Sequence, residues 1–366
     1  MGQNLFILTT YSGMLGDLIE LRPEGYYCAQ ADLYIDPMRS VKRALVTHAH
    51  SDHARGGMEH YLSHKDSEWV LRLRLGKNIS LQTMEYGESI WMNGVEITLY
   101  PAGHVPGSAQ VRLRNSKECW VISGDYKTVG DGLTPAFESV ACDYFITEST
   151  FGLPVYRWKP QAEIFTEINA WWQGCAEEGL NAVISCYSLG KAQRVLKYLD
   201  RAIGRVICHG SIAETNEALE RQGFDFGSWE RAEMRARGKK GGENVESVAG
   251  KVKGALIVCP PAAMDSQWMK QFGEYETGSC SGWMGLRGTR RWGNLDRGFV
   301  LSDHADWDQL LGAVESCGAE NVFVTHGFSE IFARYLREER GLWAQTTRAL
   351  MRGDFQVSAI EKGEDG

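Results

Sequence analysis

The sequence contains no long apolar run, no closely spaced cysteine pair and no surplus of positive charge. Without a stretch of about 18 or more apolar residues, no membrane-spanning helix is expected. No basic segment followed by an apolar core opens the chain, so we expect no secretory signal and a cytoplasmic location. The nine cysteines are scattered without a CxxC pair, which predicts reduced thiols and argues against a cysteine-based metal site.

The net charge of −8 does not favour a nucleic-acid partner, but local charge matters more than the total. One stretch is locally basic and also contains tryptophans; its arginines are Arg287, Arg290, Arg291 and Arg297. Guanidinium groups suit phosphates and aromatic rings suit bases. A solvated loop is the alternative interpretation. The position of the stretch just before His304 favours a substrate-binding strip.

The densest group of reactive side chains is His48-Ala49-His50-Ser51-Asp52-His53, with three imidazoles and one carboxylate in six positions. Nitrogen and carboxylate ligands at this density suit zinc or a similar divalent transition metal. His48 and His50 are two residues apart and should point together, whereas Asp52 and His53 can reach a second point. The segment therefore predicts two metal ions. A solvated histidine-rich loop is the alternative.

Further polar residues each follow a short β-rich run and precede a break in the pattern: His104, Asp125, Glu148, His304 and His326. Functional residues favour strand ends and the loops that follow them. Any one of these alone could be an ordinary hydrogen-bonded structural residue. Six of the nine histidines lie in such settings or in the dense segment, which argues against coincidence.

This order of residues resembles the successive metal-ligand motifs of the metallo-β-lactamase superfamily. Asp36 matches the first motif, an acid that orients the ligand loop, and Asp32 is the alternative for that role. The resemblance implies an α/β fold, with an αββα sandwich. It also implies one zinc held by His48, His50 and His104, a second held by Asp52, His53 and His326, and a bridging Asp125.

Three more segments resemble motifs A, B and C of the β-CASP nucleases, and they contain Glu148, His304 and His326 in that order. Residues 187–194 resemble the segment that opens a helix of the β-CASP insert. Residues 151–158 and 303–307 are similar to the ligase-associated DNA exonuclease group in particular. Artemis-type DNA nucleases lack a motif C histidine, however, so His326 is shared instead with the RNA-processing branch.

The pattern changes at Pro160 from short β-runs to strand–helix alternation. Residues 161–178 predict a helix with one apolar stripe, residues 190–199 predict another, and strands are expected at 180–187, 205–208 and 255–259. This alternation predicts a small parallel α/β unit. We expect a metallo-β-lactamase domain over residues 1–159 and 298–366, with a β-CASP domain inserted over 160–297. Residues 228–253 are expected to form a surface excursion.

The turn at Ser188 precedes a predicted helix that carries Lys191 and Arg194. Backbone N–H groups at a helix start, together with these cations, could hold an anion. Many such turns bind nothing. The expected position of the insert over the metal site favours a phosphate contact.

The resemblance implies a two-metal-dependent DNA nuclease, an exonuclease in DNA repair that leaves 5′-phosphate products. His304 would contact the scissile phosphate or protonate the leaving oxygen, with Glu148 orienting it. The cofactors would be two divalent ions, Zn²⁺ or alternatively Mn²⁺, and the partners DNA, a DNA ligase and a helicase. An RNA-processing nuclease is the main alternative. A small-molecule metallo-hydrolase and a metal-free scaffold subunit are the others.

Overall fold

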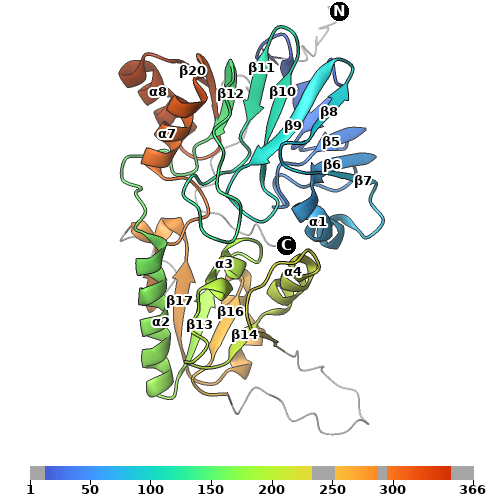
Figure 1. Cartoon of the computed structure of the whole chain (residues 1–366). Coiled ribbons are helices and arrows are strands. Elements are labelled where there is room, and N and C mark those ends of the chain that lie inside the picture. Colours follow the sequence, from blue (N-terminus) through green and yellow to red (C-terminus); the bar gives the residue numbers. More distant parts are fainter. Residues whose placement is uncertain (1–12, 233–251, 287–294, 348–366) are drawn as a thin grey trace, which may run out of the picture.

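The computed structural model describes residues 13–232, 252–286 and 295–347, and it confirms the mixed α/β class (Figure 1). The described chain forms two seven-stranded sheets and one six-stranded sheet. No described helix is long and apolar enough to cross a membrane. All nine cysteines lie in described segments, and all are free thiols, as the sequence predicts.

The first sheet is built from the first seven strands in chain order. Strands β1 to β4 pair antiparallel, and β4 to β7 pair parallel. The bounds are β1 (Gly13–Met14), β2 (Ile19–Arg22), β3 (Gly25–Cys28), β4 (Leu33–Ile35), β5 (Arg43–Leu45), β6 (His60–His64) and β7 (Leu81–Met84). The short helices η1 (Lys65–Ser67) and α1 (Glu68–Leu75) connect β6 to β7.

The second sheet has the order β20-β19-β12-β11-β10-β9-β8. Its strands β11, β12, β19 and β20 run parallel, and the hairpin strands β8 to β10 complete it. The bounds are β8 (Ser89–Met92), β9 (Val95–Pro101), β10 (Ala109–Arg114), β11 (Cys119–Ile122), β12 (Tyr144–Glu148), β19 (Asn321–Thr325) and β20 (Trp343–Thr346). Helices α7 (Trp307–Cys317) and α8 (Ser329–Arg340) flank β19 along the chain.

The two seven-stranded sheets pack face to face. One apolar cluster joins Ile35 and Leu45 of the first sheet to Ile97 and Val111 of the second. A separate cluster packs α7 and α8 against the outer face of the second sheet, and α1 covers the outer face of the first. The result is four layers in the order helix, sheet, sheet, helix (Figure 1).

The third sheet is entirely parallel and has the order β15-β14-β16-β13-β17-β18. The bounds are β13 (Asn181–Ser185), β14 (Val206–Cys208), β15 (Glu230–Arg231), β16 (Leu256–Cys259), β17 (Tyr275–Cys280) and β18 (Arg297–Phe299). Helices α2 (Gln161–Glu177), α3 (Lys191–Lys197) and α4 (Gly210–Glu220) cover one face. The short α5 (Pro261–Met264) and η3 (Gln267–Gln271) cover the other, and η4 (Gly282–Gly285) follows β17.

All strands of the third sheet lie between β12 and β19 in the chain, and the sheet forms a separate body below the first two in Figure 1. We call this body, from α2 to β18, the third-sheet unit. The predicted helices and strands of this region are confirmed, with ends that differ by one or two residues. The helix at Gln161 begins after Pro160 and buries the predicted stripe of Ile164, Ile168, Trp171 and Cys175.

Candidate metal centre

The polar residues singled out in the sequence converge because each follows the carboxyl end of a strand. Asp36 follows β4, and the segment from His48 to His53 follows β5. The remaining positions are His104 after β9, Asp125 after β11, Glu148 at the end of β12, His304 after β18 and His326 after β19. Parallel strands of one sheet bring their carboxyl ends to one edge. These strands belong to three sheets, and the loops at the carboxyl ends of all three meet here.

Asp36 holds the start of the histidine-rich loop. Its carboxylate accepts hydrogen bonds from Thr47 N at 2.8 Å and Thr47 Oγ1 at 2.6 Å, and from His53 Nδ1 at 2.7 Å. Asp32 points elsewhere, to Arg43 at 3.0 Å and the Tyr27 hydroxyl at 2.9 Å. The geometry therefore favours Asp36 over Asp32 as the residue that orients this loop.

A close approach of two loops makes Gly124 necessary. Its φ is +55°, and a Cβ there would lie 2.8 Å from Thr47 Cβ and Oγ1. A larger residue would push the following Asp125 away from the histidine-rich loop, because the contact is with the first side-chain atoms of Thr47. Thr47 was not singled out by sequence reasoning, yet it is buried and contacts both Asp36 and His48.

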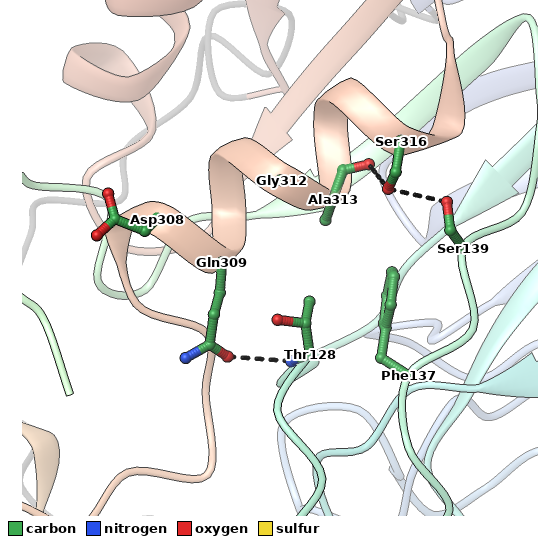
Figure 2. Close-up of a pocket in the computed structure, with 8 residues that line it drawn as sticks. All are labelled: Thr128, Phe137, Ser139, Asp308, Gln309, Gly312, Ala313 and Ser316. Carbon is green, nitrogen blue, oxygen red and sulfur yellow. Dashed lines mark hydrogen bonds between the residues drawn. The ribbon is translucent and has the colours of Figure 1, made fainter. Parts of the chain in front are cut away.

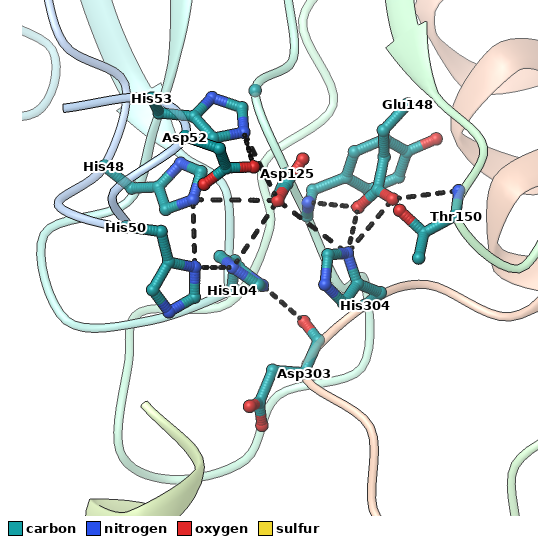
Figure 3. Close-up of polar contacts among 12 residues, drawn as sticks. His48, His50, Asp52, His53, His104, Asp125, Glu148, Thr150, Asp303 and His304 are labelled. Carbon is teal, nitrogen blue, oxygen red and sulfur yellow. Dashed lines mark hydrogen bonds and ion pairs between the residues drawn. The ribbon is translucent and has the colours of Figure 1, made fainter. Parts of the chain in front are cut away.

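Three imidazole nitrogens and one carboxylate oxygen form the first donor group (Figure 3). His50 Nδ1 lies 3.1 Å from His48 Nε2 and 3.1 Å from His104 Nε2. Asp125 Oδ2 lies 3.6 Å from the His48 nitrogen and 3.8 Å from the His104 nitrogen. A tetrahedral zinc ion with bonds of about 2.0–2.1 Å has ligand–ligand edges of about 3.3–3.4 Å, so these four atoms fit such an ion.

A second donor group lies on the other side of Asp125. His53 Nε2 is 3.3 Å from Asp52 Oδ2 and 3.6 Å from Asp125 Oδ2. His326 completes a group with His53 and Asp125, and its ring stacks on that of His53 with centroids 5.3 Å apart. Its φ of +54° is uncommon for a residue other than glycine. Asp125 belongs to both groups, which suits a bridging carboxylate.

Several donor atoms in these groups are buried and have no hydrogen-bond partner among the described residues: Asp52 Oδ1, His53 Nε2 and Asp125 Oδ1. Buried polar atoms are nearly always satisfied, and an unsatisfied one indicates an ion or water at that point. The donors are imidazole nitrogens and carboxylate oxygens, the ligand set that Zn²⁺ and Mn²⁺ accept. The residues therefore fit a pair of divalent metal ions.

The ring nitrogens that face away from the cluster have their own acceptors. His53 Nδ1 donates to Asp36, His50 Nε2 donates to the Leu189 carbonyl at 3.2 Å, and His104 Nδ1 donates to the Asp303 carbonyl at 2.8 Å. Such bonds fix the tautomer and leave the inward nitrogen free to bind a metal. Sequence reasoning missed the last two acceptors, because backbone carbonyls leave no signal in the sequence.

Burial lowers the pKa of His48 and His104 well below the usual value for imidazole, and it lowers the pKa of His50 to about 4. These rings are neutral at neutral pH, as metal binding requires. Burial also raises the pKa of Asp125 to about 7, against the opposing effect of His53. A carboxylate in this position is stabilised by any cation bound beside it.

His304 and Glu148 form a pair at the edge of the cluster. His304 Nδ1 lies 2.9 Å and 3.0 Å from the two Glu148 oxygens and 4.0 Å from Asp125 Oδ2. The Glu148 carboxylate accepts a hydrogen bond from the backbone N–H of Tyr126 at 2.8 Å. It also accepts one from the backbone N–H of Thr150 at 3.2 Å (Figure 3). Burial is the largest single influence on the pKa of His304 and lowers it, but the charge and hydrogen bond of Glu148, together with the charge of Asp125, raise the pKa to about 9.

Ser188, Lys191 and Arg194 lie close to the metal cluster but are buried. Arg194 donates to the Ser302 carbonyl at 2.6 Å and to Asp303 Oδ1 at 3.2 Å, and Lys191 Nζ lies 3.7 Å from Asp303 Oδ2. Their proposed contact with nucleic-acid phosphates stays a prediction. In the structure the charged groups of Lys191 and Arg194 face the carboxylate of Asp303.

The other candidate nucleic-acid residues, Arg287, Arg290 and Arg291, lie outside the described residues. Arg297 is described and exposed at the start of β18. Arg74 of α1 was not singled out, yet it donates to the Ala49 carbonyl at 2.7 Å and so holds the histidine-rich loop from the outer side.

Two cavities in the described chain lie away from the metal cluster. One, of about 390 Å³, lies between α7 and the loop that carries Thr128 and Phe137 (Figure 2). The other, of about 230 Å³, lies beside Trp158 and Met284. No residue of the first or second donor group lines either cavity. The candidate site is therefore defined by the donor groups and not by these cavities.

No family model matches the chain. Its sequence is 29% identical over 325 residues to a protein of Opitutus terrae named "Probable DNA ligase", and the match covers 87% of this chain and 30% of that protein. It is 30% identical over 125 residues to "Endoribonuclease ysh1" of Aspergillus fumigatus, covering 33% of this chain and 14% of the relative. The match to "Cleavage and polyadenylation specificity factor subunit 3" of Dictyostelium discoideum is 27% over 122 residues, covering 33% and 16%.

The chain therefore spans less than a third of the length of each of these relatives. Among solved structures, a protein of unknown function from Enterococcus faecalis V583 matches with a TM-score of 0.54 and 12% identity, over 78% of this chain and 75% of that one. This likeness supports the α/β fold alone.

Proposed function

We propose that this chain is a metal-dependent nuclease that hydrolyses phosphodiester bonds at two divalent ions. The observation that carries the proposal is the pair of donor groups that share Asp125, with buried donor atoms that have no hydrogen-bond partner among the described residues. His48, His50 and His104 would hold the first ion, and Asp52, His53 and His326 the second. Zn²⁺ fits both groups, and Mn²⁺ is the alternative.

We further propose that the fold is a metallo-β-lactamase sandwich with an inserted β-CASP domain. Four layers around a metal cluster at the strand ends, and a parallel unit inserted between β12 and β19, support this assignment. The proposed domains are residues 1–159 with 298–366, and residues 160–297. The return point at residue 298 lies within β18, the last strand of the third sheet.

Two such metal ions supply a nucleophilic water of lowered pKa and neutralise charge on the phosphate. The chain's own residues orient the reaction. Asp36 keeps His53 turned toward the cluster, and His304, at the edge of the cluster, would donate a proton to the leaving oxygen. The Glu148 carboxylate favours the protonated form of His304. A positioned acid of this kind contributes roughly 10²–10⁴-fold to the rate.

Phosphodiester cleavage is supported by the relatives named as endoribonucleases, and DNA as the substrate by the relative named as a DNA ligase. A ligase joins DNA ends, so a chain similar to a segment of such a protein would act on DNA ends. We propose a DNA exonuclease in repair, with 5′-phosphate products, that works with a DNA ligase and a helicase. A cytoplasmic location is part of this proposal.

RNA processing is the second candidate, and one observation favours it. His326, the candidate motif C histidine, forms a possible donor group with His53 and Asp125, which would suit the RNA-processing branch. The matches to relatives named as RNA-cleaving enzymes point the same way, although each covers only about a third of this chain. A metal-free scaffold fits less well, because the described chain retains the full donor set.

The test is a hydrolysis assay with the purified chain and either Zn²⁺ or Mn²⁺. Substrates labelled at the 5′ or 3′ end, as DNA and RNA of one sequence and in single- and double-stranded form, separate the candidates. We expect DNA to be shortened progressively from an end and faster than RNA. Faster cleavage of RNA would favour the second candidate, and no hydrolysis of any of them with either metal would overturn the proposed function.

A further inference from the structure

Two hydrogen bonds join the first donor group to the third-sheet unit and to the segment that leaves it. His50 Nε2 donates to the carbonyl of Leu189, which lies in the turn between β13 and α3. His104 Nδ1 donates to the carbonyl of Asp303, just after β18. Two of the three histidines in this group are thus oriented by backbone that belongs to, or leaves, the third-sheet unit.

Side chains of α3 fix the second of these carbonyls in place. Arg194 bonds to both the Ser302 carbonyl and the Asp303 carboxylate, and Lys191 approaches the other oxygen of Asp303. All three charged side chains are at most 7% exposed. Charges buried to this degree stay only when they are paired, so Asp303 has little freedom to move while α3 remains docked.

The same cluster of charges continues into the loop that carries Asp125. Arg194 Nε lies 3.9 Å from Asp131 Oδ2, and Lys127 Nζ lies 2.6 Å from the same oxygen. The contact between the two bodies is close, because a Cβ on Gly190 would lie 2.2 Å from Val105 Cγ1, next to His104. The third-sheet unit therefore braces the donor loops directly.

We propose that the third-sheet unit is a working part of the metal centre, with Arg194 as its main positioning residue. Arg194 holds Asp303, Asp303 orients His104, and the docked turn at Leu189 orients His50. Metal binding and docking of the third-sheet unit are then coupled, and each strengthens the other by the same factor. This inference rests on the metal centre of the proposed function, but it does not depend on the substrate.

The test compares three variants in metal affinity, measured by competition with a chromogenic chelator for Zn²⁺. Arg194→Met removes the bonds to Ser302 and Asp303. Loss of an outer hydrogen-bond partner typically weakens metal binding about 10–100-fold, and we expect a loss in that range. Arg194→Lys keeps the charge and one donor group, so it should recover part of the affinity.

Arg201→Met is the matched control. Arg201 belongs to the same unit and also binds backbone carbonyls, those of Leu196 at 2.8 Å and Phe226 at 2.6 Å, but it has no contact with the donor loops. Its metal affinity should stay near that of the unchanged protein. An equal loss in both methionine variants would show general destabilisation and overturn the inference.

Amide hydrogen exchange gives a second readout, independent of activity. Added Zn²⁺ should slow exchange in residues 187–190 and 302–304 of the unchanged protein and of Arg201→Met, and do so much less in Arg194→Met. Unchanged affinity in Arg194→Met would overturn the inference. If that variant does not fold, Asp303→Asn, which removes the same ion pairs and keeps the carbonyl, replaces it with the same expected loss.

The two proposals fail separately. A wild-type chain that binds zinc but cleaves no nucleic acid overturns the nuclease assignment and leaves the coupling to be decided by Arg194→Met. A chain that cleaves nucleic acid, and whose Arg194→Met variant binds zinc with unchanged affinity, overturns the coupling alone.

Discussion

His304 Nδ1 lies 2.9 Å from Glu148 Oε1, and this pair joins residues 156 positions apart at the edge of the metal cluster. Burial alone would lower the pKa of His304, whereas the charge and hydrogen bond of Glu148, with the charge of Asp125, raise it to about 9. The ion pair of His304 with Glu148 therefore stabilises the folded chain fully below about pH 6.5, the pKa of histidine in the unfolded chain. This stabilisation is lost as the pH rises through about 9, the pKa in the folded chain.

The first prediction concerns this pair in Glu148→Gln. Removing the negative charge should lower the pKa of His304, so the alkaline limb of the pH–rate profile should move to lower pH. Bound cations lower the pKa in both proteins, so the comparison remains valid. NMR titration of His304 in the metal-free proteins gives the same shift directly, and an unmoved His304 signal would contradict the assignment of Glu148.

The second prediction separates proton transfer from metal binding. His304→Ala should retain both metal ions and the fold, because His304 lies outside the first and second donor groups. Its turnover should nevertheless fall by about 10²–10⁴-fold. Metal content is measured by elemental analysis, and turnover with labelled DNA. Loss of one ion in this variant would instead make His304 a ligand.

The third prediction concerns the second donor group. The unchanged chain should contain about two ions, and Asp52→Ala and His53→Ala should each abolish hydrolysis, because each removes a donor from one ion. Asp66→Ala is a control, since the Asp66 carboxylate faces His64 at 3.8 Å and no donor group. Full activity in Asp52→Ala, or a single ion in the unchanged protein, would rule out the two-metal arrangement.

The fourth prediction compares two neighbouring aspartates with similar backbone. Asp36 and Asp32 have φ angles of +44° and +51°, so replacement by alanine imposes a similar backbone cost at both. Asp36→Ala also frees His53 and Thr47, and should weaken metal binding about 10–100-fold. Asp32→Ala should leave metal affinity unchanged in the same chelator competition. Equal effects would show that only the backbone matters.

The fifth prediction concerns the arginine-rich stretch outside the described residues. Replacing Arg290 and Arg291 together by alanine should lower the slope of log affinity against log salt for DNA by roughly 2, about one for each phosphate that an arginine no longer neutralises. Hydrolysis of a small activated phosphodiester should stay nearly the same. Exposed Arg334 and Arg340 of α8, also replaced together, give a charge-matched control. An unaltered slope would return the stretch to a solvated loop.

Two helices and three strands of the third-sheet unit could be predicted from sequence because their signals are local. Pro160 and the apolar stripe from Ile164 to Cys175 define α2 within a single segment. The signal for the candidate metal ligands also lies within a single segment. Three imidazoles and a carboxylate within six positions indicate a metal without any knowledge of distant contacts.

Local sequence signals did not reveal that the charged side chains of α3 are buried and paired with a carboxylate. Lys191 and Arg194 follow a turn at a helix start, and from sequence they indicate phosphate contacts. Their burial against Asp303 depends on how β18 returns to the first two sheets, more than a hundred residues later. No pattern within either segment contains that information.

The sequence by itself thus determined the candidate donor residues, the class of metal they suit and the strand–helix alternation of the third-sheet unit, because these depend on residue type and spacing. Only the tertiary structure decided that Asp36 rather than Asp32 orients the loop. It also decided that the carbonyls of Leu189 and Asp303 orient two of the histidines. These relationships depend on which strand ends lie together in the fold. Two of the acceptors are backbone carbonyls, which every residue has, so no residue type in the sequence could indicate them.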